Sequence, residues 1–214
     1  MASPTKYLEL TIDVFDQRSQ RAQVVPDITA KDLVGAILDE FRADLNYLGA
    51  DAAGYRLRRE PNRETLEEGK ALGDLLANGD HLVLEEHDQA LPQGTERPSR
   101  PIYLQDVTSG QTYRIGWQPA FVGRYDELME FNDLVAVELS VAAGGSRVSR
   151  RHLKLWEEDG HFFVRAASTN PVAIVRPDNT VVTVPRDGQV RIEPKDMIQL
   201  ERSGLSLKFI VREA

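Results

Sequence analysis

The sequence predicts a protein of two domains, the first of mixed α and β structure and the second all β. Residues 6–87 combine alternating apolar residues with one stretch of apolar residues at helical spacing, whereas residues 101–214 contain short apolar runs separated by turn pairs. Between them, residues 88–100 hold two prolines, a glycine and almost no apolar side chains, which predicts a flexible linker. A chain of 214 residues is long enough to give each domain its own core.

The first domain is predicted to begin with a hairpin. Residues 1–6 are expected to be a loose tail, and residues 7–14 place Leu, Leu, Ile and Val on one face with the period of two that is typical of a strand. Residues 20–25 predict the returning strand.

A helix is expected next. Thr29 stands three residues before Asp32, close to the capping-box spacing. Apolar residues follow at helical spacing, and the pattern predicts that the helix ends near Gly49.

Residues 55–59 predict a third strand, residues 65–76 a Leu-Glu-Glu-Gly turn and a short helix, and residues 81–84 a closing strand. This order of elements resembles the β-grasp fold of ubiquitin-like domains, and among them the small bacterial ones associated with type VII secretion. The resemblance implies a surface that binds a second protein partner. Because no diglycine follows Glu86, it does not imply covalent conjugation.

The second domain is predicted to be a β-sandwich, because its short strands are separated at regular intervals by turn pairs. Loops of a sandwich gather at its two ends, so a site built from several loops suits this architecture. The turn pairs are Ser109-Gly110, Asp159-Gly160, Asp178-Asn179, Asp187-Gly188 and Ser203-Gly204. The residues expected in the core are Trp156, Phe163, Ile198, Leu200, Leu207 and Phe209.

Composition excludes several classes of function. Without cysteine there is no disulfide, thiolate nucleophile or cysteine zinc site, and four scattered histidines do not predict a metal centre, so no cofactor is expected. No apolar run reaches the roughly 20 residues of a membrane helix, and no signal peptide opens the chain. We therefore expect no membrane insertion, a cytoplasmic location, and recruitment to a membrane complex at most.

Charge is distributed unevenly. Residues 1–99 hold 11 Lys and Arg against 19 Asp and Glu, while residues 100–214 hold 15 of each, so the first half carries the net charge of −8. A nucleic-acid-binding protein would present a basic face, and we therefore expect no nucleic-acid partner. Arginines in a neutral half favour a local anion site instead.

Three short motifs in the second half contain residues suited to an anion site. They are Gly123-Arg124, Val148-Ser149-Arg150-Arg151-His152 and Ser168-Thr169-Asn170, each placed where an apolar run changes to a polar loop. Arginine presents a planar fork of donors to phosphate oxygens, and hydroxyl groups add short hydrogen bonds. The set therefore predicts a site for a phosphate monoester.

In this order over the second domain, the motifs resemble those of the forkhead-associated (FHA) domain, a module that binds phosphothreonine peptides. The resemblance implies that Arg124, Ser149, Arg150 and Thr169 hold the phosphate. It implies that Asn170 bonds the backbone of the bound peptide.

Gly123 and His152 are expected to support the site. Glycine at a strand end allows the backbone to come close to a neighbouring loop. Ser149 and His152 could suggest a nucleophile and its base, but no third residue is placed to orient the histidine, so we expect no enzyme activity.

The sequence departs from the FHA pattern where Pro171 replaces the glycine that usually follows the asparagine. Proline fixes φ and removes a backbone donor, which puts peptide specificity in question more than phosphate binding. Arg176 and Arg147 are candidates for specificity, Arg176 by facing an acidic residue of the peptide; a solvated charge is the alternative.

The leading hypothesis is a phosphothreonine-binding adaptor that acts downstream of a Ser/Thr kinase, with a second partner on the ubiquitin-like domain; alanine- and arginine-rich usage suggests a bacterial source. The alternative is a structural subunit of a type VII-like secretion assembly that does not depend on phosphate. A third possibility is that Thr95, in the linker, is phosphorylated and bound by another copy of the chain.

Overall fold

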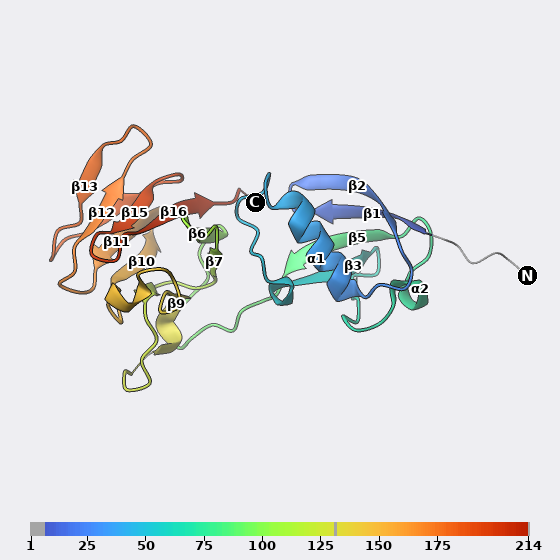
Figure 1. The fold of residues 1–214 in the computed structure, drawn as a ribbon, viewed down its shortest axis with the longest axis horizontal. Coiled ribbons are helices and arrows are strands. Elements are labelled where there is room, and N and C mark those ends of the chain that lie inside the picture. The colour runs from blue at the N-terminus through green and yellow to red at the C-terminus, as the bar shows by residue number, and fades with distance from the viewer. Residues whose placement is uncertain (1–6, 131, 214) are drawn as a thin grey trace, which may run out of the picture. The chain divides into compact units, whose positions relative to one another are not determined.

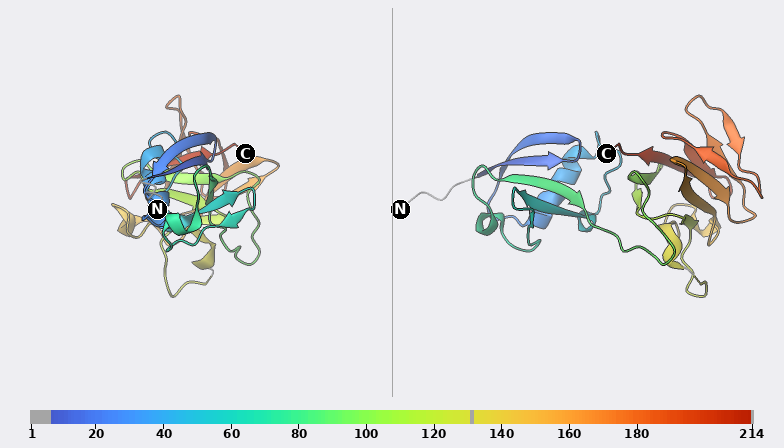
Figure 2. Two further views of the ribbon diagram at one scale, coloured as in Figure 1. Left: turned by 90° about the vertical axis from the view of Figure 1, so that its right-hand side faces the viewer. Right: turned by 180° about the vertical axis from the view of Figure 1, so that it is seen from behind.

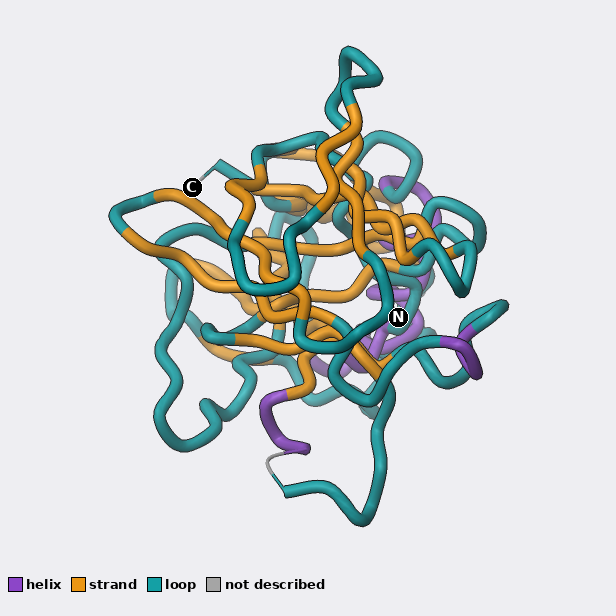
Figure 3. Tube along the Cα trace, turned by 90° about the vertical axis from the view of Figure 1, so that its left-hand side faces the viewer, coloured by secondary structure: helices purple, strands orange, loops and turns teal. Residues whose placement is uncertain are grey.

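A computed structural model of the chain describes residues 7–130 and 132–213. The tail predicted over residues 1–6 lies outside the described residues. The chain divides into two compact units, Met1–Asp88 and Gln89–Ala214 (Figures 1 and 2). Strands and loops make up most of the trace in Figure 3, so the chain is mostly β.

The first unit contains a five-stranded sheet in the order β2-β1-β5-β3-β4. β1 and β5 are parallel, and the other neighbouring strands are antiparallel. The strands are β1 (Leu8–Val14), β2 (Gln17–Val24), β3 (Tyr55–Glu60), β4 (Glu64–Thr65) and β5 (His81–Glu86). The helices are α1 (Ala30–Phe41), the 3-10 turn η1 (Ala52–Gly54) and the single turn α2 (Leu72–Leu75).

The helix α1 begins with the predicted capping box. The Thr29 hydroxyl accepts from the Asp32 N–H (3.2 Å), and the Asp32 carboxylate accepts from the Thr29 N–H (3.0 Å). The helix ends at Phe41 rather than near residue 49, because Asp44 and Asn46 are weak helix formers. The apolar residues beyond Phe41 are still buried, in turns rather than in a helix.

The second unit is a sandwich of two sheets, in the orders β14-β11-β10-β8-β9 and β13-β12-β15-β16-β6-β7. Every strand pair is antiparallel except β8 with β9. One cluster of buried apolar side chains draws on both sheets, which confirms the predicted β-sandwich.

The strands of the second unit are β6 (Ile102–Asp106), β7 (Thr112–Ile115), β8 (Ala120–Gly123), β9 (Val135–Glu138), β10 (Leu153–Glu158), β11 (His161–Ala166), β12 (Val172–Val175), β13 (Val181–Thr183), β14 (Val190–Ile192), β15 (Met197–Leu200) and β16 (Leu205–Val211). Two 3-10 turns, η2 (Asn132–Leu134) and η3 (Gly145–Arg147), lie in its loops. The hairpin between β10 and β11 turns at Asp159 (φ 50°) and Gly160 (φ 74°), which is the left-handed backbone that an Asp-Gly pair favours.

Four of the six residues predicted for the core are fully buried, namely Ile198, Leu200, Leu207 and Phe209. The prediction is wrong for Trp156 and Phe163, which are only half-buried. They alternate with buried neighbours on β10 and β11, so they point away from the core, and their rings stack at 5.8 Å on the outer face.

The segment predicted as a linker over residues 88–100 differs from a free chain. From Gln89 it belongs to the second unit. Glu96 and Gln118 exchange backbone hydrogen bonds of 2.9 and 2.7 Å, and the Arg100 guanidinium lies over the Phe162 ring at 5.4 Å. Residues of this segment therefore contact the sandwich through hydrogen bonds and a cation–π contact. The composition of the segment does not predict these contacts.

None of the helices within residues 7–130 and 132–213 combines the length and apolarity that crossing a bilayer requires.

The core of the sandwich provides a test of the fold. Phe209 is fully buried and its ring meets that of Phe162 edge-on at 5.3 Å. Replacing it in Phe209→Ala should lower the free energy of unfolding of the second unit by about 3–5 kcal/mol, since the change leaves a cavity. Urea unfolding of the full chain measures this. Val181→Ala, at a residue that is 60% exposed, should change it by under about 0.5 kcal/mol, and equal effects would contradict the fold.

Candidate functional site

Strand directions bring the predicted motifs to one end of the sandwich. The end of β8 lies beside the start of β10, because Val122 is opposite Leu153. The end of β11 lies beside the same start of β10, because Ala166 is also opposite Leu153. The parallel strand β9 ends beside β8, with Gly123 opposite Glu138. The loops that follow β8, β9 and β11 therefore leave the sheet at the same end.

Gly123 holds the first two loops together. The Arg124 N–H donates to the carbonyl oxygens of Ser149 (3.2 Å) and Arg150 (3.0 Å), and the Gly123 carbonyl accepts from the Leu139 N–H (2.8 Å). A Cβ atom at Gly123 would lie 2.0 Å from the Arg150 carbonyl oxygen. Only glycine lets the loop lie this close to the strand, as the sequence predicts.

The Arg124 side chain turns toward the same loop. Its Nε donates to the Val148 carbonyl oxygen at 2.5 Å, which fixes the plane of the guanidinium. In the part of the chain that the structure describes, its two terminal nitrogens have no hydrogen-bond or ion-pair partner. Arg124 therefore presents two free terminal nitrogens, with four N–H donors, at the end of the sandwich.

The positive charge of Arg124 acts on the carboxylate of Glu138. Burial raises the pKa of Glu138, but hydrogen bonds from Ser140 and from the Tyr125 N–H, together with the positive charge of Arg124, lower it overall. The carboxylate is thus ionised and occupied, accepting at 2.8 to 3.1 Å from these neighbours rather than from Arg124.

Ser149, Ser168 and Asn170 form a hydrogen-bonded cluster across two loops. The Ser149 hydroxyl lies 3.0 Å from the Ser168 hydroxyl and accepts from the Asn170 amide at 2.8 Å. The Ser168 hydroxyl also accepts from the Asn170 N–H at 3.2 Å. The second and third motifs are therefore in contact, although 19 residues separate Ser149 from Ser168.

His152 braces this cluster from beneath. It is fully buried, and its Nδ1 accepts from the Ser149 N–H at 3.2 Å. Its own backbone joins two strand ends, since its N–H donates to Val122 (2.8 Å) and its carbonyl accepts from Ala167 (2.9 Å). Burial lowers the pKa of His152, an effect that the Pro171 carbonyl partly offsets, so the ring is neutral near pH 7.

Arg150 is placed differently from Arg124. Its Nε is paired with the Asp126 carboxylate, while 57% of its side chain stays exposed. Asp126 belongs to the loop after β8, so the pair joins the first two loops. Arg150 can reach an anion only by sharing or leaving this partner.

Two further predicted residues are open to solvent. Thr169 is exposed between the bonded Ser168 and Asn170. Arg147 is exposed at the end of η3, and no carboxylate pairs with it among the described residues. Its carbonyl lies 3.5 Å from the Asn170 amide, which places it beside the cluster.

Arg176 is not brought to the site. It follows β12 at the end of the strand opposite to Asn170. Its guanidinium pairs with the buried carboxylate of Asp196 and donates to the Arg191 carbonyl at 2.9 Å. Arg176 is thus a structural residue at the other end of the sandwich and not a contact for a peptide at this one.

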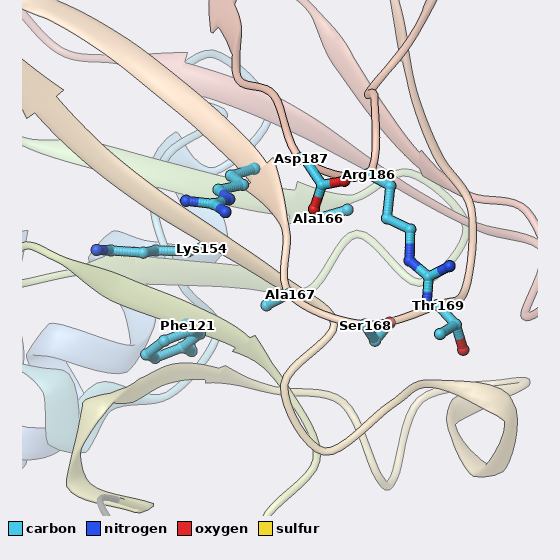
Figure 4. A pocket seen from close by; sticks show the side chains of 9 residues that line it. Phe121, Lys154, Ala166, Ala167, Ser168, Thr169, Arg186 and Asp187 are labelled. Atoms are coloured by element: carbon cyan, nitrogen blue, oxygen red, sulfur yellow. The ribbon is translucent and has the colours of Figure 1, made fainter.

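Sequence reasoning missed two residues and one pocket. Ser168 and Asp126 join the loops through side-chain bonds, and only Ser168 had a signal, as part of the Ser-Thr-Asn run. A pocket of about 480 Å³ beside Thr169 was also missed (Figure 4). Strand alternation could have placed Lys154 and Arg165 together on its wall.

The arrangement lacks the geometry of a nucleophile. The Ser149 hydroxyl is bonded to Ser168 and Asn170, whereas His152 receives the Ser149 backbone N–H. Activation of a hydroxyl needs a base within hydrogen-bond reach of that hydroxyl. Within residues 7–130 and 132–213, no group of acidic or histidine side chains has the arrangement of a metal site.

No protein-family model matches the sequence, and neither does any curated protein. Solved structures with a similar fold include the FHA domain of human APLF in complex with a bisphosphorylated XRCC1 peptide, which is 19% identical, covers 51% of this chain and 97% of its own, and gives a TM-score of 0.39. The FhaA FHA domain, in complex with the intracellular domain of Rv3910, is 24% identical over 52% of this chain and 99% of its own (TM-score 0.35). A de novo design based on ubiquitin is 20% identical over 42% of this chain and 100% of its own (TM-score 0.32).

Substitution at Gly123 tests the backbone contact. Gly123→Ala should destabilise the second unit by about 1–3 kcal/mol, because the added methyl group forces the strand end and the loop apart. Gly69→Ala is the control, since an added Cβ there meets no atom within 4 Å. Urea unfolding measures both, and an unchanged midpoint for Gly123→Ala would contradict the geometry.

The pKa of His152 predicts a pH dependence. The unfolded chain binds this proton near the usual value of 6.5, whereas the folded chain binds it only at lower pH. The free energy of unfolding should therefore fall as the pH is lowered below 6.5. An NMR titration of the His152 ring should give a midpoint below 6.5, and a midpoint at or above that value would contradict the buried, neutral state.

Proposed function

We propose that this chain is a phosphothreonine-dependent adaptor. Its second unit would bind a phosphothreonine peptide of a protein partner at the loop end of the sandwich, with Arg124, Ser149, Arg150, Thr169 and Asn170 as the contacts. The proposal describes a binding module without catalysis, consistent with the bonds that occupy the Ser149 hydroxyl.

The observation that carries the proposal is the unpaired fork of Arg124 beside the cluster of Ser149 and Asn170. A phosphate dianion needs several donors around one small volume, and arginine with hydroxyl groups supplies them. The Val148 carbonyl and the Gly123 contact hold these donors in place before a ligand arrives. Less ordering is then required on binding, which favours affinity.

The expected affinity follows from the donors. Each charge-assisted hydrogen bond contributes roughly 1.5–3 kcal/mol net. Two or three such bonds from Arg124, with a hydroxyl bond from Thr169 and one from Ser149 when its hydroxyl turns from Ser168 to the phosphate, account for most of the about −8 kcal/mol of a micromolar complex. A threonine without phosphate offers no charge to these donors, so the complex would form only after a Ser/Thr kinase has acted.

The first unit is proposed to be a ubiquitin-like β-grasp domain that binds a second partner. The order β2-β1-β5-β3-β4 with α1 and the parallel pair of β1 and β5 supports this assignment. With one unit for a phosphorylated protein and one for another protein, the chain would bring two partners together.

The alternative, a phosphate-independent subunit of a type VII-like secretion assembly, requires the sandwich to pack permanently on a neighbour. Free donors at Arg124 favour an exchangeable anion over a permanent apolar contact. A stable oligomer that phosphatase treatment leaves unchanged would support the alternative.

Recognition of a phosphorylated Thr95 in another copy has less support. The Thr95 hydroxyl donates to the Pro92 carbonyl at 2.7 Å and is partly buried. A kinase would have to break this bond and free the segment around Thr95. Mass spectrometry that finds Thr95 unmodified in cells would exclude this mode of self-recognition.

Isothermal titration with matched peptides tests the proposal. A phosphothreonine peptide, chosen from a library screened on the full chain, should bind with a micromolar Kd, and its unphosphorylated form should bind at least about 100-fold more weakly. Arg124→Ala should weaken the phosphopeptide by about 10- to 150-fold, because charge-assisted bonds are lost.

Lys208→Ala is the matched control for Arg124→Ala. Lys208 is a half-buried cation on β16, pointing outward from the other sheet. Lys208→Ala should leave the Kd of the phosphopeptide unchanged. Equal affinities of the two peptides, or equal effects of the two variants, would reject the proposed function.

A further inference from the structure

The pocket beside Thr169 lies against the outer face of the sheet that carries the phosphate loops. It has a volume of about 480 Å³, and its wall continues from Ser168 and Thr169 onto β8, β10 and β11 (Figure 4). Ser168 belongs to the hydrogen-bonded cluster, so pocket and cluster share a wall. A peptide held at the cluster would have this pocket as its neighbouring surface.

Three cations and one carboxylate line the pocket, namely Lys154, Arg165, Arg186 and Asp187. In the described part of the chain, none of the three cations forms an ion pair. The pocket therefore carries an excess of positive charge in a unit whose total charge is balanced.

Two of these cations stand directly opposite each other. Lys154 on β10 pairs in register with Arg165 on β11. Side chains at such positions lie about 4.5–5.5 Å apart at Cβ, and like charges there destabilise a sheet. The Lys154 ammonium leans over the Trp156 ring at 5.5 Å, which relieves part of the repulsion without neutralising it. The pair is stabilised when an anion lies between its members.

The third cation connects the pair to the phosphate site. Arg186 lies in the loop between β13 and β14, and this loop meets the same end of the sandwich because β14 begins beside the end of β11. In Figure 4 the Arg186 side chain extends toward Thr169, while the Asp187 carboxylate lies near Ala166. An anion could thus be held by Arg186 on one side and by the strand cations on the other.

We propose that this pocket binds a second anionic group of the same phosphopeptide, either an acidic side chain or a second phosphate, and so selects phosphothreonine within acidic sequence. The inference rests on the proposed function. A peptide is favoured over a nucleic acid because the cations occupy one pocket. Strand alternation also places Glu158, at the far end of β10, on the same face as Lys154, where its charge disfavours a long polyanion.

The test compares one reference peptide with two series of peptides by titration into the full chain at constant salt. The reference carries phosphothreonine with neutral flanks. The first series adds one Asp at successive positions up to about five residues on either side, and the second series adds a second phosphothreonine at those positions instead. At one position in the series, the added anion should tighten binding by about three- to tenfold. Whether Asp or phosphothreonine gives the larger gain distinguishes the two sources of charge.

The double variant Lys154→Gln with Arg165→Gln should bind the neutral-flank phosphopeptide as the natural sequence does and lose the gain from the second anion. Lys208→Gln, on the other sheet, should keep the gain.

A gain that survives the double variant, or no gain at any position, would overturn this inference and leave phosphothreonine binding intact. A neutral-flank phosphopeptide that does not bind at all would instead overturn the proposed function. Binding of single-stranded oligonucleotide that the double variant abolishes, without discrimination among peptides, would assign the pocket to nucleic acid and overturn the inference.

Discussion

The loop end of the sandwich depends on the absence of a side chain at Gly123. Because no Cβ stands between Gly123 and the Arg150 carbonyl, the Arg124 N–H can donate to the carbonyl oxygens of both Ser149 and Arg150, in the loop before β10. The same approach brings the Val148 carbonyl within reach of Arg124 Nε. One close backbone contact therefore fixes both the position of the loop and the direction in which the guanidinium points.

Buried and exposed polar groups have different tasks at this end. His152 is fully buried and neutral, and its bond to the Ser149 N–H holds the loop from inside. Ser149 then presents its hydroxyl to Ser168 and Asn170 rather than to a base. Such a hydrogen-bonded surface with a free arginine fork suits the reversible capture of an anion that we propose.

The sequence predicts the sandwich and the meeting of its motifs because strand alternation and turn pairs are local signals. It predicts Arg124, Ser149 and Asn170 at one end for the same reason, since each follows a strand. It fails where the deciding contact is distant along the chain: Arg176 is held by the buried Asp196, and Arg150 is paired with Asp126. Trp156 and Phe163 also mislead, because large aromatic residues suggest a core while their register places them on the outer face.

The most direct measurement is a map of amide chemical shifts in the ¹⁵N-labelled full chain as a phosphothreonine peptide is added. The account predicts that the largest changes fall on Arg124, Ser149, Arg150, Thr169 and Asn170, three loops that meet only in the folded sandwich. Changes centred on the opposite end, around Arg176, or no change in these loops at saturating peptide would contradict it.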